Sequence, residues 1–145
     1  MNVRRLIERL NALLSRIPEA LLLLFTRIAV GHVFWASGRT KVEGWGLSPS
    51  AVDLFRNEYK VPIIPPETAA IMAATMEHLL PLILLLGFGT RFAALGLFGM
   101  TLVIQIFVYP DAWWLHAMWL AALAWIIAKG GGALSLDHLL ARRIR

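Results

Sequence analysis

A nearly unbroken apolar run from Thr68 to Arg91 constrains this chain more than any other part of its sequence. As a helix, the run is long enough to cross the hydrocarbon core of a bilayer. Glu77 lies in its middle, where an ionised carboxylate costs roughly 2.5 kcal/mol or more unless it meets a partner or water. Ala69 and Ala73 precede Glu77 at intervals of four residues, so one helix face carries two small residues and the acid. We expect this face to pack on a neighbouring span.

The composition fits a small membrane protein. Of its 145 residues, 59% are hydrophobic and only 16% are charged, with a net charge of +5. A soluble domain would need a polar surface that these residues cannot build. The cations flank apolar stretches, so they indicate membrane topology and not nucleic-acid binding. The chain has no cysteine, which excludes thiolate metal ligation, disulfide exchange on the chain itself and covalent haem attachment.

Three further apolar stretches join the first. We predict an all-α membrane protein, in which one domain over residues 1–145 is a bundle of four transmembrane helices. The expected spans are at about 18–38, 68–88, 91–109 and 112–129. The short turn Tyr109-Pro110-Asp111 makes the third and fourth spans antiparallel neighbours.

Short helices are expected outside the spans. Residues 1–16 place apolar side chains opposite arginines and lack the compact apolar core of a cleavable signal peptide. They predict an amphipathic helix in the headgroup layer, or alternatively a docking helix for a partner. Ser48-Pro49 predicts a short helix start in the 44–67 connection, which is either a lid over the bundle or a plain spacer. Ser135 predicts the cap of a last surface helix.

Basic residues predict the orientation. One side of the expected membrane holds Arg4, Arg5, Arg9, Arg16, Arg91, Lys129, Arg142, Arg143 and Arg145, and the other holds Arg39, Lys41, Arg56 and Lys60. Cytoplasmic loops carry the excess of Lys and Arg, so both termini are expected in the cytoplasm.

Two charged residues are expected deep in the membrane. Arg27 enters its span from one side and Glu77 enters from the other, each about ten residues deep, or roughly 15 Å along a helix. We predict that they form an intramembrane ion pair. The pair either only locks the first two spans together or also serves a ligand or a proton.

A second polar layer is expected nearer the outer face. Its histidines and glutamine lie beside aromatic residues, which suits either satisfied hydrogen bonds in the bundle or a quinone headgroup with flat apolar walls. The candidate pocket residues are His32, Trp35, Arg39, Lys41, His78, Gln105, Tyr109 and His116. No residues have the spacing of a metal site, and no catalytic residue is assigned.

The sequence resembles the DoxX family of small bacterial membrane proteins. The likeness rests on the acid in the second span, on LLLGFGTR leading directly into the third span, on the loop after the first span and on the ending GGGALSLDHLL. It covers about Leu21 to Leu140. WASGRTKVEG matches the basic, glycine-containing stretch of the family only loosely, and His78 and Pro81 stand where small or aliphatic residues are expected.

The resemblance implies a multi-pass protein of the bacterial inner membrane. The family name is tied to the small subunit of a thiosulfate:quinone oxidoreductase, so we expect a membrane subunit of a quinone-linked redox or oxidative-stress complex. A quinone is then the ligand, and a soluble or membrane partner carries the electrons, because the chain has no intrinsic redox cofactor motif. The alternative is a non-enzymatic scaffold, chaperone or small-molecule carrier. A homo-oligomer and an enzymatic activity of the chain itself both stay open.

Overall fold

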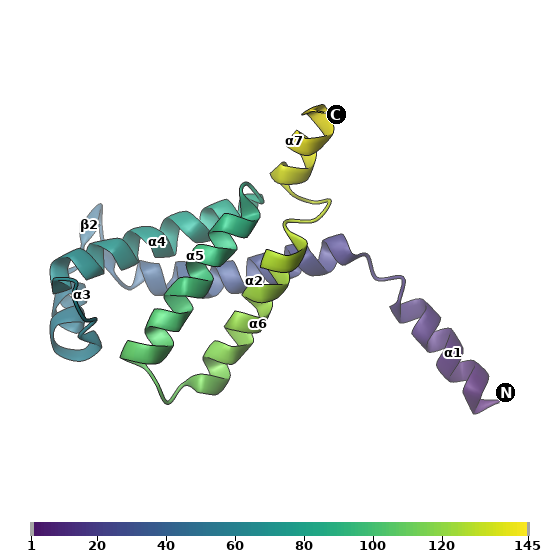
Figure 1. Cartoon of the computed structure of the whole chain (residues 1–145), viewed down its shortest axis with the longest axis horizontal. Coiled ribbons are helices and arrows are strands. Elements are labelled where there is room, and N and C mark those ends of the chain that lie inside the picture. Colours follow the sequence, from purple (N-terminus) through teal and green to yellow (C-terminus); the bar gives the residue numbers. More distant parts are fainter. Residues whose placement is uncertain (1, 145) are drawn as a thin grey trace.

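The computed structural model describes residues 2–144, and almost all of its regular structure is helical (Figure 1). In chain order the elements are α1 (Val3–Leu14), α2 (Glu19–Arg39), β1 (Val42–Glu43), β2 (Gly46–Leu47), α3 (Pro49–Leu54), the π-helical turn η1 (Phe55–Tyr59), α4 (Pro66–Leu86), α5 (Thr90–Val103), the π-helical turn η2 (Ile104–Val108), α6 (Trp113–Lys129) and α7 (Leu136–Ile144). Apart from the short antiparallel hairpin of β1 and β2, the predicted all-α class is confirmed.

Three helices in the described part of the chain are long and apolar enough to cross a membrane. They are α2, α4 and the continuous helix Thr90–Val108, which joins α5 to η2. The fourth apolar helix, α6, is shorter, with 17 residues. The chain is therefore a multi-pass helical membrane protein.

Glycine permits the tight hairpin between α4 and α5. Gly87 ends α4 with a φ of 71°, and Gly89 precedes α5 with a φ of 54°. Only glycine adopts this left-handed conformation without a steric penalty. The two helices therefore share one end of the molecule and diverge from it (Figure 1).

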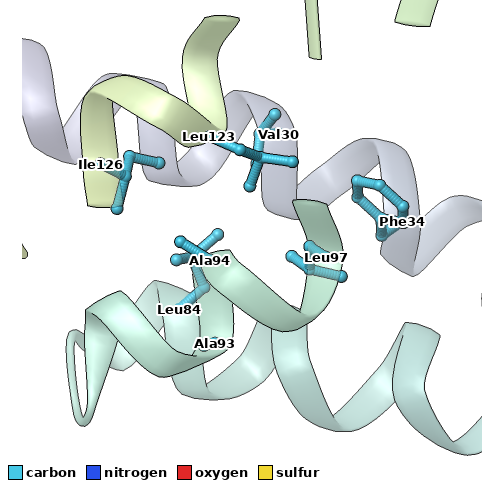
Figure 2. Packing of buried hydrophobic residues seen from close by; sticks show 8 residues of the cluster. All are labelled: Val30, Phe34, Leu84, Ala93, Ala94, Leu97, Leu123 and Ile126. Carbon is cyan, nitrogen blue, oxygen red and sulfur yellow. The ribbon is translucent and has the colours of Figure 1, made fainter. Parts of the chain in front are cut away.

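The main core lies where α2, α4, α5 and α6 meet (Figure 2). Its buried apolar residues are Val30, Phe34, Leu84, Ala93, Ala94, Leu97, Leu123 and Ile126. Lipid gives helices no hydrophobic driving force to associate, so close packing between them must hold the bundle together, and small residues make that packing possible. Gly96 illustrates this, because a Cβ atom there would lie 2.8 Å from Cδ1 of Leu80 on α4.

The connection between α2 and α4 packs against the start of α4. Phe55 of η1 forms a second buried cluster with Ala69 and Ala70, and Ala73 packs at its side. Ala69 and Ala73 were expected to face a neighbouring span, but α4 extends past the end of α2, and the connection covers this part of it. Ser48 caps α3 as predicted, since its side chain accepts a hydrogen bond from the backbone N–H of Ala51.

The surface helices at both ends of the chain are also confirmed. α1 extends away from the bundle and buries none of its residues (Figure 1). Ser135 begins α7, with its hydroxyl accepting from the backbone N–H of His138 at 3.2 Å.

Candidate functional site

A buried ion pair joins the end of α2 to the middle of α4. Lys41 lies two residues past the end of α2, and both it and Glu77 are 3% exposed. Nζ of Lys41 donates to Oε2 of Glu77 at 2.7 Å, to Oγ of Ser37 at 3.0 Å and to the carbonyl oxygen of Ser37 at 3.3 Å. The hydroxyl of Ser37 donates in turn to Oε1 of Glu77 at 3.2 Å. The carboxylate is thus paired and hydrogen-bonded, as a buried charge requires.

The predicted ion pair between Arg27 and Glu77 is wrong. Arg27 is 1% exposed and is satisfied by backbone oxygens. Its guanidinium donates to the carbonyls of Leu84 (2.9 Å from Nε), Leu85 (2.6 Å from Nη2), Gly131 (2.7 Å from Nη1) and Leu134 (2.9 Å from Nη1). We call this arrangement the carbonyl clamp. It occupies the C-terminal end of α4, where unpaired carbonyls and the helix dipole favour a cation.

The pairing of α2 with α4 explains the error. The prediction aligned the midpoints of the two spans, whereas Arg27 lies beside Leu84 and Ser37 lies beside Glu77. Ser37 is ten residues beyond Arg27, which is about 15 Å along a helix. Arg27 is therefore far from the level of Glu77, and Lys41 takes its place.

Asp137 completes the polar contacts at the clamp end of the molecule. Its Oδ1 accepts from the backbone N–H of Gly89 at 2.7 Å, and its Oδ2 accepts from the N–H and the hydroxyl of Thr90 at 2.9 and 2.7 Å. These bonds cap the N-terminus of α5. Partial burial favours the neutral acid, but the hydrogen bonds from Thr90 and Gly89 and the charge of Arg27 outweigh it and lower the pKa of Asp137.

A cavity of about 380 Å³ opens at the other end of the bundle, beside the Lys41–Glu77 pair. Residues from α2, α4, α5, η2, α6 and the connection line it, and most of them are apolar. Its polar lining residues are Ser37, Lys41, Tyr59, Glu77, Tyr109, His116 and Trp119. We call this space the cavity. Phe55, Tyr59, Val61 and Ile64 form its wall from the connection, so the connection acts as a lid and not as a plain spacer.

His116 presents an unpaired ring nitrogen in this region. The amide nitrogen of Gln105 donates to the carbonyl of Pro110 at 2.6 Å, so its oxygen is the atom that lies 2.6 Å from Nδ1 of His116. Nδ1 must therefore carry a proton. Among the described residues Nε2 has no hydrogen-bond partner, and the side chain, 2% exposed, lines the cavity.

Two tyrosines connect the lid to the end of η2. The hydroxyl of Tyr109 donates to Oε1 of Glu58 at 2.9 Å and lies 3.5 Å from the hydroxyl of Tyr59. The Tyr59 contact, partial burial and the carboxylate of Glu58 all raise the pKa of Tyr109 above its ordinary value. The phenol therefore stays a neutral donor that holds the lid to η2.

The structure brings together some of the eight predicted pocket residues. Lys41, Tyr109 and His116 line the cavity, and Gln105 contacts it through His116. Sequence reasoning missed Ser37 and Trp119. Ser37 precedes Lys41 by four residues, and this spacing on one helix face was the available signal.

The other four predicted pocket residues lie elsewhere. His32 and Trp35 line a separate groove of about 290 Å³ on the Arg27 side of α2. His78 lies edge-on to Trp35, with ring centroids 4.9 Å apart, and its Nδ1 bonds to the carbonyl of Ala74 at 2.7 Å. Arg39 is exposed. These side chains are on other faces of α2 and α4 than the cavity.

No group of three or more His, Asp or Glu residues within 2–144 has the geometry to hold a metal ion.

A family model described as DoxX matches residues 22–110, which is more than half of the chain. The chain belongs to the DoxX family. The region of this DoxX protein that the family model matches contains Arg27, Lys41 and Glu77, whereas His116 and Asp137 lie beyond it. Comparisons with curated proteins and with solved structures give no match.

Proposed function

We propose that this DoxX protein is the quinone-binding membrane subunit of a redox complex, with the quinone ring in the cavity. One observation carries the proposal: an apolar cavity inside a membrane protein has buried polar groups on its wall. Its volume, about 380 Å³, is within the range of small-molecule sites, which also combine apolar walls with a few polar groups. A quinone ring has the matching chemistry, because its flat faces are apolar and its polar atoms lie at its edge.

The lining residues also suit a ligand that arrives from the bilayer. Met72 and Met76 of α4 and Val103 of α5 line the cavity and are exposed on the outside of the bundle. In a membrane these side chains contact lipid, so an apolar molecule dissolved in the bilayer reaches the cavity between α4 and α5. Methionine adapts its shape at such binding surfaces.

The electrons in this proposal come from a partner. The chain has no cysteine, and the described residues contain no cluster that could hold a metal ion. The DoxX protein then contributes the binding site and the orientation of the ring, and a redox protein beside it exchanges electrons with the ring.

We also propose the topology that this role requires. α6 crosses the membrane as a fourth span, since 17 residues is at the short end of the spanning range. The excess of basic residues places both termini in the cytoplasm of a bacterial inner membrane, with the cavity towards the outer face. A reporter that works only after export, fused after Arg145, should be inactive, and an active fusion would contradict this orientation.

Binding of decylubiquinone, a short-chain quinone, tests the function. The purified protein in detergent should bind it with micromolar affinity by isothermal titration calorimetry. Ala73→Phe adds a ring to the cavity wall, and we expect at least a tenfold weaker affinity, about 1.4 kcal/mol. Ala124→Phe adds the same volume at an exposed position of α6 outside the cavity, and it should bind as the wild type does.

Two results would overturn the proposal. One is that the wild-type protein binds decylubiquinone in neither its oxidised nor its reduced form, and the other is that the Ala73 and Ala124 variants bind it equally well. The first result would favour the non-enzymatic scaffold or chaperone, and the second would place the ligand outside the cavity.

A further inference from the structure

We infer that the cavity selects the reduced, hydroquinone form of its ligand over the oxidised quinone. This inference rests on the proposed function and deepens it. It follows from counting which hydrogen-bonding groups of the cavity wall are already used and which are free. The two forms of the ligand differ in this respect, because a quinone has two carbonyl acceptors and a hydroquinone has two hydroxyl donors.

The buried donors of the wall are all used. The ammonium of Lys41 has three N–H groups, and it makes three hydrogen bonds, one to Glu77 and two to Ser37. The single hydroxyl proton of Ser37 goes to Oε1 of Glu77. The proton on Nδ1 of His116 goes to the oxygen of Gln105. None of these groups has a proton left for a ligand carbonyl.

The buried acceptors of the wall are only partly used. A carboxylate accepts about four hydrogen bonds, and Glu77 receives two from the described residues, from Ser37 and Lys41. His116 keeps Nε2 as a free acceptor, because its partner is a neutral amide and a buried imidazolium would need a counter-charge. The cavity therefore offers a carboxylate oxygen and a ring nitrogen to hydroxyl groups.

Two further donors line the cavity, and they do not reverse this preference. Tyr59 and Trp119 are half-buried, and their donors are a neutral hydroxyl and a neutral indole N–H. A hydroxyl that donates to the carboxylate of Glu77 makes a charge-assisted hydrogen bond, which is about twice as strong as a neutral one. A quinone carbonyl at the same place would face a lone pair and leave both groups unpaired.

The preference changes the chemistry of the bound ring. A site that holds the reduced form ten times more tightly raises the potential of a bound two-electron couple by about 30 mV. The bound quinone is then easier to reduce with two electrons and two protons than the quinone free in the bilayer. This suits a subunit whose partner delivers electrons to the ring.

The test compares the two redox forms of one probe. Decylubiquinone and decylubiquinol are titrated separately into the purified protein by calorimetry without oxygen. We expect decylubiquinol to bind at least ten times more tightly. Equal affinities, or tighter binding of the quinone, would overturn the inference and leave the proposed function standing. Failure of both forms to bind would overturn the proposed function itself.

Variants then assign the preference to the wall. Glu77→Gln replaces the carboxylate with a neutral amide, which can donate an N–H to a ligand carbonyl, and His116→Phe removes the free ring nitrogen at nearly constant shape. Each should reduce the affinity ratio of quinol to quinone by threefold or more. Thr26→Ala removes a hydroxyl from α2 that bonds to the carbonyl of Leu22 outside the cavity, and it should leave the ratio unchanged. An unchanged ratio in both the Glu77 and His116 variants would refute the assignment.

Discussion

Two buried cations from the same stretch of chain meet opposite environments. Arg27, within α2, donates to four backbone carbonyls, and each of these bonds joins it to α4 or to the segment after α6. Lys41, just past the end of α2, pairs with the carboxylate of Glu77 beside a cavity of about 380 Å³. One cation is held by backbone carbonyls of other segments, and the other is paired with a carboxylate on the wall of the cavity.

We interpret the clamp end as structural and the cavity end as functional. A guanidinium presents five donors in a rigid fork, so one side chain can satisfy the ends of several segments at once. At the clamp end Arg27 and Asp137 serve this purpose, because each hydrogen-bonds to backbone groups of other segments. At the cavity end, Glu77 and His116 keep free acceptors next to a space of ligand size, which the stability of the fold alone does not require. The predictions below test this contrast.

The largest effect is expected for Arg27→Met. It removes the Arg27 donor from four carbonyls, of which that of Leu84 also accepts from the N–H of Gly87 at 3.2 Å. Each buried group left unsatisfied costs about 1–3 kcal/mol. We expect a loss of at least about 3 kcal/mol, seen as a fall of roughly 10 °C in the midpoint of thermal unfolding in detergent. Protein that stays folded should keep its affinity for the cavity ligand.

Arg91→Met is the control for this prediction. Arg91 is exposed and makes one hydrogen bond, to the carbonyl of Ala128 at 3.2 Å, so its loss should cost less than about 1 kcal/mol. If both arginine variants lost the same stability, the clamp would not hold this end of the bundle together.

A smaller effect is expected from the coupling between Lys41 and Glu77. Lys41→Met and Glu77→Gln each leave a buried charge without its partner, so the double variant should lose less stability than the sum of the two. We expect a coupling energy of about 2 kcal/mol from thermal unfolding in detergent.

The matched cycle combines Arg27→Met with Glu77→Gln. These residues lie at different levels of the α2–α4 pair, so their effects should add to within about 0.5 kcal/mol. Additive effects for Lys41 and Glu77, or coupling for Arg27 and Glu77, would reverse the assignment of the two cations.

The smallest effect is expected for Asp137→Asn, which weakens the cap of α5 by about 1 kcal/mol near neutral pH. Because the pKa of Asp137 is lowered in the folded state, the carboxylate stabilises the fold fully above its unfolded pKa, about 3.9. This contribution is lost as the pH falls through the lower folded value. The stability difference between wild type and variant should therefore shrink below about pH 4 in thermal unfolding experiments.

Asp53→Asn provides the comparison. Its carboxylate is exposed and contacts Arg56 at 3.4 Å, so the change should matter little at any pH. A pH-independent difference between wild type and the Asp137 variant would mean that the carboxylate does not cap α5 in its charged form.

Local features of the fold were predictable from the sequence. Apolar runs of sufficient length indicated helices that cross a membrane, and Ser48 and Ser135 marked the starts of two short helices. The glycines after the second span marked the hairpin before α5. Each of these signals depends on residues that are close together in the chain, because helix caps, left-handed turns and apolar length are local properties.

The candidate site was only partly predictable. The sequence identified Glu77, Lys41 and His116 as residues worth attention, because polar side chains in apolar helices need partners. It did not identify which partners. Gln105 was named in the polar layer, but its role in fixing the proton on Nδ1 of His116 depends on the carbonyl of Pro110.

The apolar runs and the charges within them define a helical membrane protein whose buried charges need partners. Which partners they meet depends on how the helices pack against one another. A Cβ atom on Gly31 would lie 3.7 Å from the carbonyl oxygen of Pro81, and one on Gly38 would lie 3.0 Å from Cβ of Glu77. Such close contacts between the small residues of α2 and the facing atoms of α4 set how far α2 lies along α4. Any buried charge needs a partner, so this alignment decides which group within reach becomes the partner. The helices were therefore encoded locally, whereas the ion pair and the cavity beside it depend on how those helices pack.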